Sequence, residues 1–161
     1  MFTSTTSEGG MPGTINVAVE HVEGITSKAT VRTHTTLVDR GVAKGGMDRG
    51  PAGGEYLVIG LGGCFTSHLL AAIGARSAPM SKVHVDVSGT MDGTPERFTS
   101  FTIEVTAECD DDDLARKLVT IAGRGCQVVN TLRRSATVAI SYAGMPIDVT
   151  DDGTAPSTIA S

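Results

Sequence analysis

Cysteine is scarce in this chain of 161 residues, which contains three: Cys64, Cys109 and Cys126. Three cysteines are too few for a disulfide scaffold at this length, and none stands at the close spacing typical of metal ligands. We therefore expect a reducing compartment and no metal held by the cysteines. The opening stretch MFTSTTSEGGMPG also lacks the basic start and the apolar core of a secretory signal, which favours the cytoplasm.

Positive charge is also in short supply, because 13 lysines and arginines face 18 aspartates and glutamates and leave a net charge of −5. An acidic chain is a poor partner for a phosphate backbone, so we expect no nucleic-acid partner. Long apolar runs are few, and only Tyr56 to Ala75 approaches the length of a membrane span. Polar residues such as Ser67 and His68, together with glycines, interrupt this run. We expect a buried helix and no membrane partner.

The length fits one domain over residues 1–161, with flexible Ser/Thr/Gly-rich tails at 1–13 and 150–161. Period-two alternation in TINVAVEHV and in KATVRTHTTLV predicts an opening hairpin that turns at Glu23-Gly24. The glycine-rich run DRGVAKGGMDRGPAGG, residues 39–54, predicts an irregular loop. The long apolar helix follows this loop.

The second half of the chain alternates strands and helices. Period-two alternation predicts strands in KVHVDVSG and in SFTIEVTAE. Helical spacing predicts a helix in DDDDLARKLVTIAG, which starts at its aspartates and has Gly123 as its C-terminal cap. A short helix opening near Cys126 and a strand in ATVAISY complete the pattern. Hairpins outnumber crossovers in this order, which predicts an α+β fold.

Two of the cysteines, Cys64 and Cys126, lie at positions that favour a reactive thiol. Cys64 has His68 four residues later and Ser67 three residues later, on one side of the helix. A protonated imidazole would lower the pKa of the thiol, and the thiolate is the nucleophile. The alternative is a small buried hydrophobe beside a core histidine. Cys126 starts a helix, where the dipole would also favour a thiolate, or else it is a packed thiol. Only the tertiary fold could bring the two together.

The segments GGEYLVIGLGGCFTSHL and AGRGCQVVNTLRRSATVAI, in this order and at this separation, resemble the OsmC/Ohr family of osmotically inducible and organic hydroperoxide resistance proteins. The resemblance covers nearly the whole chain. It implies an OsmC-like fold, with antiparallel sheets around a long central buried helix, and an intertwined homodimer with sites at the subunit interface. It also implies a cysteine-based peroxidase that needs no metal, haem or other cofactor. In the implied cycle, Cys64 attacks an organic hydroperoxide and becomes a sulfenic acid. Cys126 then closes a disulfide, which a dithiol reductant reopens.

The resemblance also implies an arginine, held by a glutamate, that activates the attacking thiol. The matching glutamate is Glu55, nine residues before Cys64, which on one helix is half a rotation and about 13 Å away. We therefore expect Glu55 to act from the preceding loop, through an arginine or across the dimer, unless it is only a helix-start carboxylate.

The arginine itself is harder to place from the sequence. The turn EHVEGITSK lacks the hairpin arginine of the hydroperoxide branch, which puts efficient peroxidase activity in question. The loop used in the osmotically inducible branch offers Arg40, which we predict to be the activator, and Arg49. Arg49 and Arg32 are the reserves, and His68 is a partial substitute.

The resulting hypothesis is a cytoplasmic, homodimeric hydroperoxide reductase for oxidative-stress defence, with Leu61 and Phe65 lining an apolar substrate pocket. Its rivals are a non-catalytic small-molecule-binding module that uses the same dimer cleft, and a purely structural stress protein. Cys109 matches no position of the family and reads as structural.

Overall fold

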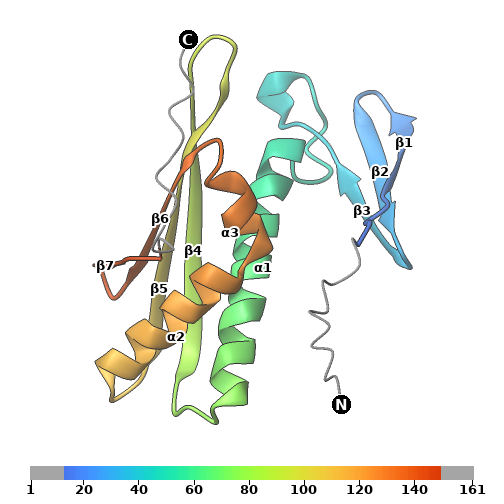
Figure 1. The fold of residues 1–161 in the computed structure, drawn as a ribbon. Coiled ribbons are helices and arrows are strands. Elements are labelled where there is room, and N and C mark those ends of the chain that lie inside the picture. Colours follow the sequence, from blue (N-terminus) through green and yellow to red (C-terminus); the bar gives the residue numbers. More distant parts are fainter. Residues whose placement is uncertain (1–12, 150–161) are drawn as a thin grey trace, which may run out of the picture. The chain divides into compact units, whose positions relative to one another are not determined.

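The computed structural model describes residues 13–149, so the tails expected at 1–13 and 150–161 lie, apart from Gly13, outside the described residues (Figure 1). The chain divides into two compact units, one ending at Gly53 and the other beginning at Gly54. Each unit is built around its own sheet. The organisation of residues 1–161 as a single domain stays a prediction.

The first unit is a three-stranded antiparallel sheet in the order β1-β2-β3. Its strands are β1 (Ala18–Glu23), β2 (Thr26–Val31) and β3 (His34–Val38). The predicted turn at Glu23-Gly24 is confirmed, with Gly24 at φ 57°. The prediction of a simple hairpin is wrong, because the second predicted strand turns back on itself at Arg32, which has φ 53°.

The glycine-rich loop follows β3 and folds onto itself. It contains the short 3-10 helix η1 (Val42–Lys44), and the rest is irregular, as predicted. A Cβ added at Gly46 would overlap the backbone carbonyl of Arg40, and one added at Gly50 would overlap that of Leu37. The glycines therefore allow the backbone to pack against itself where no side chain fits.

The second unit combines three helices with a four-stranded sheet in the order β4-β5-β6-β7. Its elements are α1 (Gly53–Ala75), β4 (Ser81–Asp92), β5 (Arg97–Glu108), α2 (Asp112–Gly125), α3 (Gln127–Leu132), β6 (Thr137–Tyr142) and β7 (Met145–Ile147). Strands β4 and β5 form a long antiparallel hairpin, whereas β5 and β6 are parallel. The prediction of purely antiparallel sheets is therefore wrong for this sheet, because α2 and α3 carry the chain back before β6 begins.

The core of this unit lies between the sheet and the helices, which cover the same face of the sheet in Figure 1. Strand β5 alternates buried and exposed residues, and its buried set is Phe101, Ile103 and Val105. The helices contribute apolar side chains at helical spacing, such as Leu61, Phe65 and Leu69 from α1 and Leu118 and Ala122 from α2. The other face of the sheet is polar.

Helix α1 is only partly buried, which corrects the expectation of a buried central helix. Leu57, Ile59 and Leu70 are 38%, 53% and 52% exposed. Among the described residues α1 is the one helix long and apolar enough to cross a membrane, a property that it shares with core helices of soluble proteins. Its apolar character on all sides indicates a second surface that the chain itself leaves uncovered.

A local signal in the sequence explains where α2 begins. Asp111 caps α2 by accepting a 2.9 Å hydrogen bond from the Leu114 amide, as the aspartate run predicted. Gly123 is not the C-terminal cap, since α2 runs on to Gly125.

Tyr142, at the end of β6, is buried, with 4% of its surface exposed. Burial raises the pKa of its phenol most, and the nearby charges of Cys109 and Asp112 raise it further.

Candidate functional site

Two of the three cysteines of the second unit, Cys64 and Cys126, meet. Cys64 projects from the middle of α1 and is partly buried, whereas Cys126 lies between α2 and α3 and is fully buried. The thiol of Cys126 is within hydrogen-bonding reach of the Cys64 side chain, and both are free thiols. The fold therefore places two sulfurs that are distant in sequence side by side.

The environment of Cys126 favours the neutral thiol. Burial raises its pKa most, and the hydrogen bond and charge of Cys64 raise it further. Hydrogen bonds from the amides of Val129 and Val128, in the first turn of α3, act in the opposite direction but are outweighed. Of the two alternatives for Cys126, the packed thiol fits this environment and the thiolate does not, although the amides that favour a thiolate are present.

The backbone of Cys126 belongs to two helices. Its N–H donates to the carbonyl of Ala122 at 3.0 Å and so closes α2, and its carbonyl accepts from the Asn130 amide at 3.0 Å and so opens α3. The Asn130 side chain adds a 3.0 Å bond to the Arg124 carbonyl. This double anchorage fixes where the Cys126 side chain can point.

His68 lies one turn beyond Cys64, and its imidazole contacts the other cysteine segment. The Nε2 atom is 2.9 Å from Oε1 of Gln127, the residue after Cys126. The ring also lies against Gly125, where an added Cβ would come within 3.3 Å of Nδ1. Ser67, the other neighbour singled out in the sequence, donates back to the Gly63 carbonyl of its own helix at 2.9 Å.

Glu55 is placed differently from the sequence expectation. It lies in the first turn of α1, which begins at Gly53, and not in the preceding loop. The location fits the alternative of a helix-start carboxylate. Because α1 is continuous to Ala75, the half rotation between Glu55 and Cys64 holds, and Glu55 cannot reach Cys64 along this helix.

The three candidate arginines all belong to the first unit. Arg40 is exposed and begins the glycine-rich loop. The guanidinium of Arg49 is 3.3 Å from the carboxylate of Glu23 on β1, in an ion pair open to solvent. Arg32 forms the β2–β3 turn. The choice of Arg40 as the activator of Cys64 stays a prediction.

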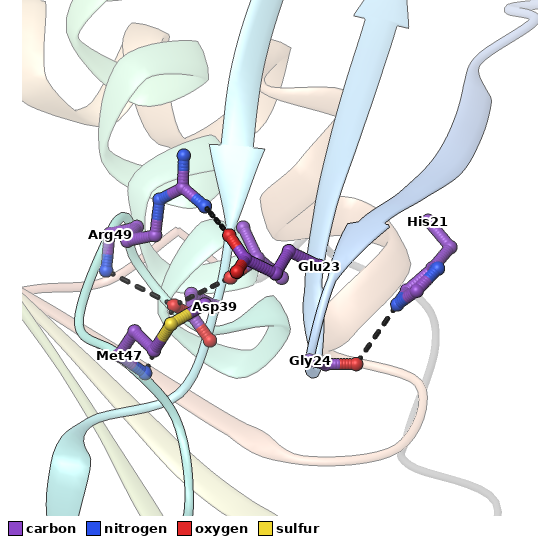
Figure 2. A network of polar contacts seen from close by, with 7 residues as sticks. His21, Glu23, Gly24, Asp39, Met47 and Arg49 are labelled. Atoms are coloured by element: carbon purple, nitrogen blue, oxygen red, sulfur yellow. Dashed lines mark hydrogen bonds and ion pairs between the residues drawn. The ribbon is translucent and has the colours of Figure 1, made fainter.

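Sequence reasoning missed Asp39, a carboxylate that is 2% exposed and organises this loop. It accepts hydrogen bonds from the Thr26 hydroxyl at 3.0 Å and from the amides of Arg40, Met47 and Arg49 at 2.7, 3.2 and 3.2 Å. Figure 2 shows Asp39 against Met47 and Arg49, with the Arg49 side chain reaching Glu23. Burial opposes ionisation, but these bonds outweigh it and the pKa of Asp39 is lowered. An aspartate that directly precedes a glycine-rich loop was the available signal.

Three further residues singled out in the sequence are Leu61, Phe65 and Cys109. Leu61 and Phe65 are fully buried in the core, so they do not line an open substrate pocket as expected. Cys109 follows the end of β5, and its thiol donates to the Asp111 carbonyl at 3.3 Å. Within residues 13–149 no three side chains of His, Cys, Asp or Glu gather in a group that could hold a metal ion.

The fold and the cysteine segments have known counterparts. Residues 45–141 match the family model described as OsmC-like protein. No curated protein matches the chain. The chain is similar to an organic hydroperoxide resistance protein OsmC from Legionella pneumophila, with 17% identity, a TM-score of 0.65, and coverage of 81% of this chain and 96% of that one.

Two other solved structures are also similar to this chain in fold. An OsmC-like protein from Mycoplasma pneumoniae is 14% identical with a TM-score of 0.69, covering 82% of this chain and 99% of its own. An organic hydroperoxide resistance protein from Elizabethkingia anophelis is 16% identical with a TM-score of 0.66, covering 82% of this chain and 96% of its own. At these identities the likeness shows the fold alone.

Proposed function

Because the chain belongs to the OsmC-like protein family, as the sequence resemblance predicted, we propose that it is a cysteine-based peroxidase that reduces organic hydroperoxides. The observation that carries the proposal is the contact between the thiols of Cys64 and Cys126. Relatives of the same fold are named for organic hydroperoxide resistance. The role is defence against oxidative stress, in the reducing environment of the cytoplasm.

The two thiols differ in ways that assign their order of action. The pKa of Cys126 is raised and its side chain is fully buried, so it stays protonated and is the poorer first nucleophile. Cys64 is more accessible and lies one turn from His68. Cys64 is therefore the peroxide-attacking thiol, and Cys126 is the resolving thiol.

The proposed cycle has three steps that balance in atoms and electrons. The Cys64 thiolate attacks the O–O bond, becomes a sulfenic acid, and releases an alkoxide that takes up a proton to leave as the alcohol. The Cys126 thiol then attacks the sulfenic sulfur, so that a disulfide forms and water leaves. A dithiol reductant returns the disulfide to two thiols and is itself oxidised to a disulfide.

We propose that the working form is a homodimer. The exposed side of α1 includes the apolar residues Ile59 and Leu70 and two glycines, Gly60 and Gly63, at which an added Cβ would meet nothing within 4 Å. Apolar side chains beside open positions suit close packing of another helix, and a second copy of this chain supplies one. We propose that Glu55 acts on the cysteine pair through an arginine or across the dimer, with Arg40 as the activating arginine and Arg49 and Arg32 as its reserves.

The experiment is reduction of cumene hydroperoxide in the presence of dithiothreitol. We expect turnover by the wild type, loss of turnover to the uncatalysed background in Cys64→Ser, and near wild-type turnover in the control Cys109→Ser. In Cys126→Ser one equivalent of peroxide should still oxidise Cys64, but no disulfide should appear on a non-reducing gel. Turnover that survives Cys64→Ser contradicts the proposal. Tight binding of an apolar dye without peroxide loss would favour the binding-module alternative.

A further inference from the structure

One side-chain contact joins the two cysteine segments without involving either sulfur. His68 is on α1, one turn beyond Cys64, and Gln127 is on α3, directly after Cys126. Their side chains meet at 2.9 Å between Nε2 and Oε1. The bond therefore ties the start of α3 to the turn of α1 that follows the attacking thiol.

A second observation supports a tight fit at this place. The imidazole of His68 lies over Gly125, so close that an added Cβ would stand 3.3 Å from Nδ1. Gly125 ends α2, and Cys126 comes next. His68 thus touches the residues on both sides of Cys126 in the sequence, Gly125 by packing and Gln127 by a hydrogen bond.

We propose that His68 and Gln127 are positioning residues that keep Cys126 turned toward Cys64, and so set the rate at which the disulfide closes. A disulfide needs the sulfurs to approach from contact to about 2.05 Å at a restricted dihedral angle, so small movements of the α3 start reduce the fraction of productive encounters. Gln127 has no part in the first attack on peroxide, and the positioning role of His68 is separate from its place beside the attacking thiol. The inference rests on the proposed function, but it can be measured apart from peroxide.

The measurement uses glutathione disulfide as the oxidant. The Cys64 thiolate displaces glutathione thiolate to form a mixed disulfide, and the Cys126 thiol then displaces the second glutathione to close the Cys64–Cys126 bond. Quenching with acid at intervals and mapping the peptides by mass spectrometry gives the rate of the second step and distinguishes Cys109. A redox buffer of reduced and oxidised glutathione gives the effective concentration of Cys126 at equilibrium.

Gln127→Ala removes the bond while keeping a good helix former at an exposed position of α3. A hydrogen bond of ordinary strength corresponds to a loss of roughly 3- to 10-fold in closure rate and in effective concentration. Gln127→Glu restores an acceptor oxygen and should bring both quantities back toward the wild type. Thr131→Ala is the matched control, because its hydroxyl bonds only to the Gln127 carbonyl within α3, and it should close as the wild type does.

Gly125→Ala tests the packing contact independently and should also slow closure, since the imidazole must shift to admit the methyl group. Formation of the mixed disulfide at Cys64 should be unchanged in every variant. Closure at the wild-type rate in both Gln127→Ala and Gly125→Ala, or equal slowing in Thr131→Ala, overturns the inference. If the wild type closes as expected with glutathione disulfide but leaves cumene hydroperoxide intact, the proposed function fails and the positioning role stands.

Discussion

At the scale of single residues, burial decides the chemistry of this site more than sequence neighbours do. Cys126 starts α3 and receives the amide contacts that stabilise a thiolate, yet enclosure by the core raises the pKa of its thiol. Asp39 is enclosed to a similar degree, but four donors converge on it and the pKa of its carboxyl is lowered. The number of hydrogen bonds to the charged form separates the two outcomes.

The raised pKa of Cys126 predicts an alkaline loss of stability. The folded chain holds this proton more tightly than the unfolded chain does, so the stabilisation is complete below the unfolded-state pKa and is lost as the pH rises through the folded-state pKa. Urea unfolding under reducing conditions, from about pH 7 to about pH 11, should show the free energy of unfolding falling with pH. In Cys126→Ala the free energy of unfolding should fall less steeply with pH, because only the contribution from ionisation of Tyr142 remains. Identical slopes in the two proteins would contradict this prediction.

At the scale of elements, the glycine-rich loop depends on one carboxylate. Asp39 follows β3, and its oxygens bond to amides at both ends of the loop, while its own N–H donates to the Pro51 carbonyl at 3.2 Å. The loop is too poor in apolar side chains to form a core of its own, because the residues between Arg40 and Ala52 are mostly glycine or polar. Its conformation is therefore set by these hydrogen bonds.

We expect Asp39→Asn to loosen this loop. The amide group turns one acceptor into a donor that faces backbone N–H groups, so hydrogen exchange at Arg40, Met47 and Arg49 should become faster. Asp92→Asn is the matched control, since Asp92 accepts a bond only from the next residue in an exposed turn, and it should leave exchange in the loop unchanged. In the wild type the loop should loosen as the pH falls through the lowered pKa of Asp39 and stay ordered above the usual aspartate range. Unaltered exchange in Asp39→Asn at neutral pH would disprove this role.

Most elements could be predicted from the sequence, and the exceptions have physical reasons. Alternation found β4 and β5, and helical spacing found α2, because each buries one regular face. Helix α1 was found from its length, its Leu/Ala content and its weak period-two signal. The β2–β3 turn was missed because Arg32 adopts a positive φ without a glycine or asparagine to signal it. Strand β7 was missed because it has three residues, although Ala143 and Gly144 form a turn with two positive φ values of the kind that joins hairpins. The parallel pairing of β5 with β6 follows from the long helical connection, a signal that was present but outweighed by counting hairpins.

The site was predictable only in part. The pairing of Cys64 with Cys126 came from the family resemblance, since periodicity carries no information about contacts so far apart in sequence. The bond between His68 and Gln127 and the buried carboxylate of Asp39 depend on tertiary neighbours and could not be foreseen from spacing. Leu61 and Phe65 were misassigned to a pocket because apolar residues on α1 serve either the core or an outer surface, and sequence alone does not separate the two faces of a helix that is apolar all round.

At the scale of the whole molecule, the chain leaves apolar surface on both units. Val19 on β1 is 63% exposed and Ile59 on α1 is 53% exposed. Isolated exposed apolar residues are ordinary, but on α1 they stand beside open glycines on an apolar helix. This combination is the physical basis for expecting a second copy of the chain.

Assembly can be tested with a charge on this side of α1. We expect the wild type to sediment at twice the chain mass of 16.6 kDa, and Ile59→Glu to sediment as the single chain, because a carboxylate would be buried unpaired in the interface. Thr106→Glu, on the exposed polar face of the β4–β7 sheet, is the control and should remain dimeric. A dimer that survives Ile59→Glu unchanged would rule out this surface of α1.

Tyr142 also gives the chain an optical property of its own. The sequence contains no tryptophan and two tyrosines, so absorbance in the aromatic band comes almost wholly from Tyr56 and Tyr142. Because the phenol of Tyr142 is shielded in the core and its pKa is raised, its phenolate band should emerge late in an alkaline titration and early once the second unit opens. The molecule thus carries a native chromophore that reports on the integrity of the core of the second unit, without any label.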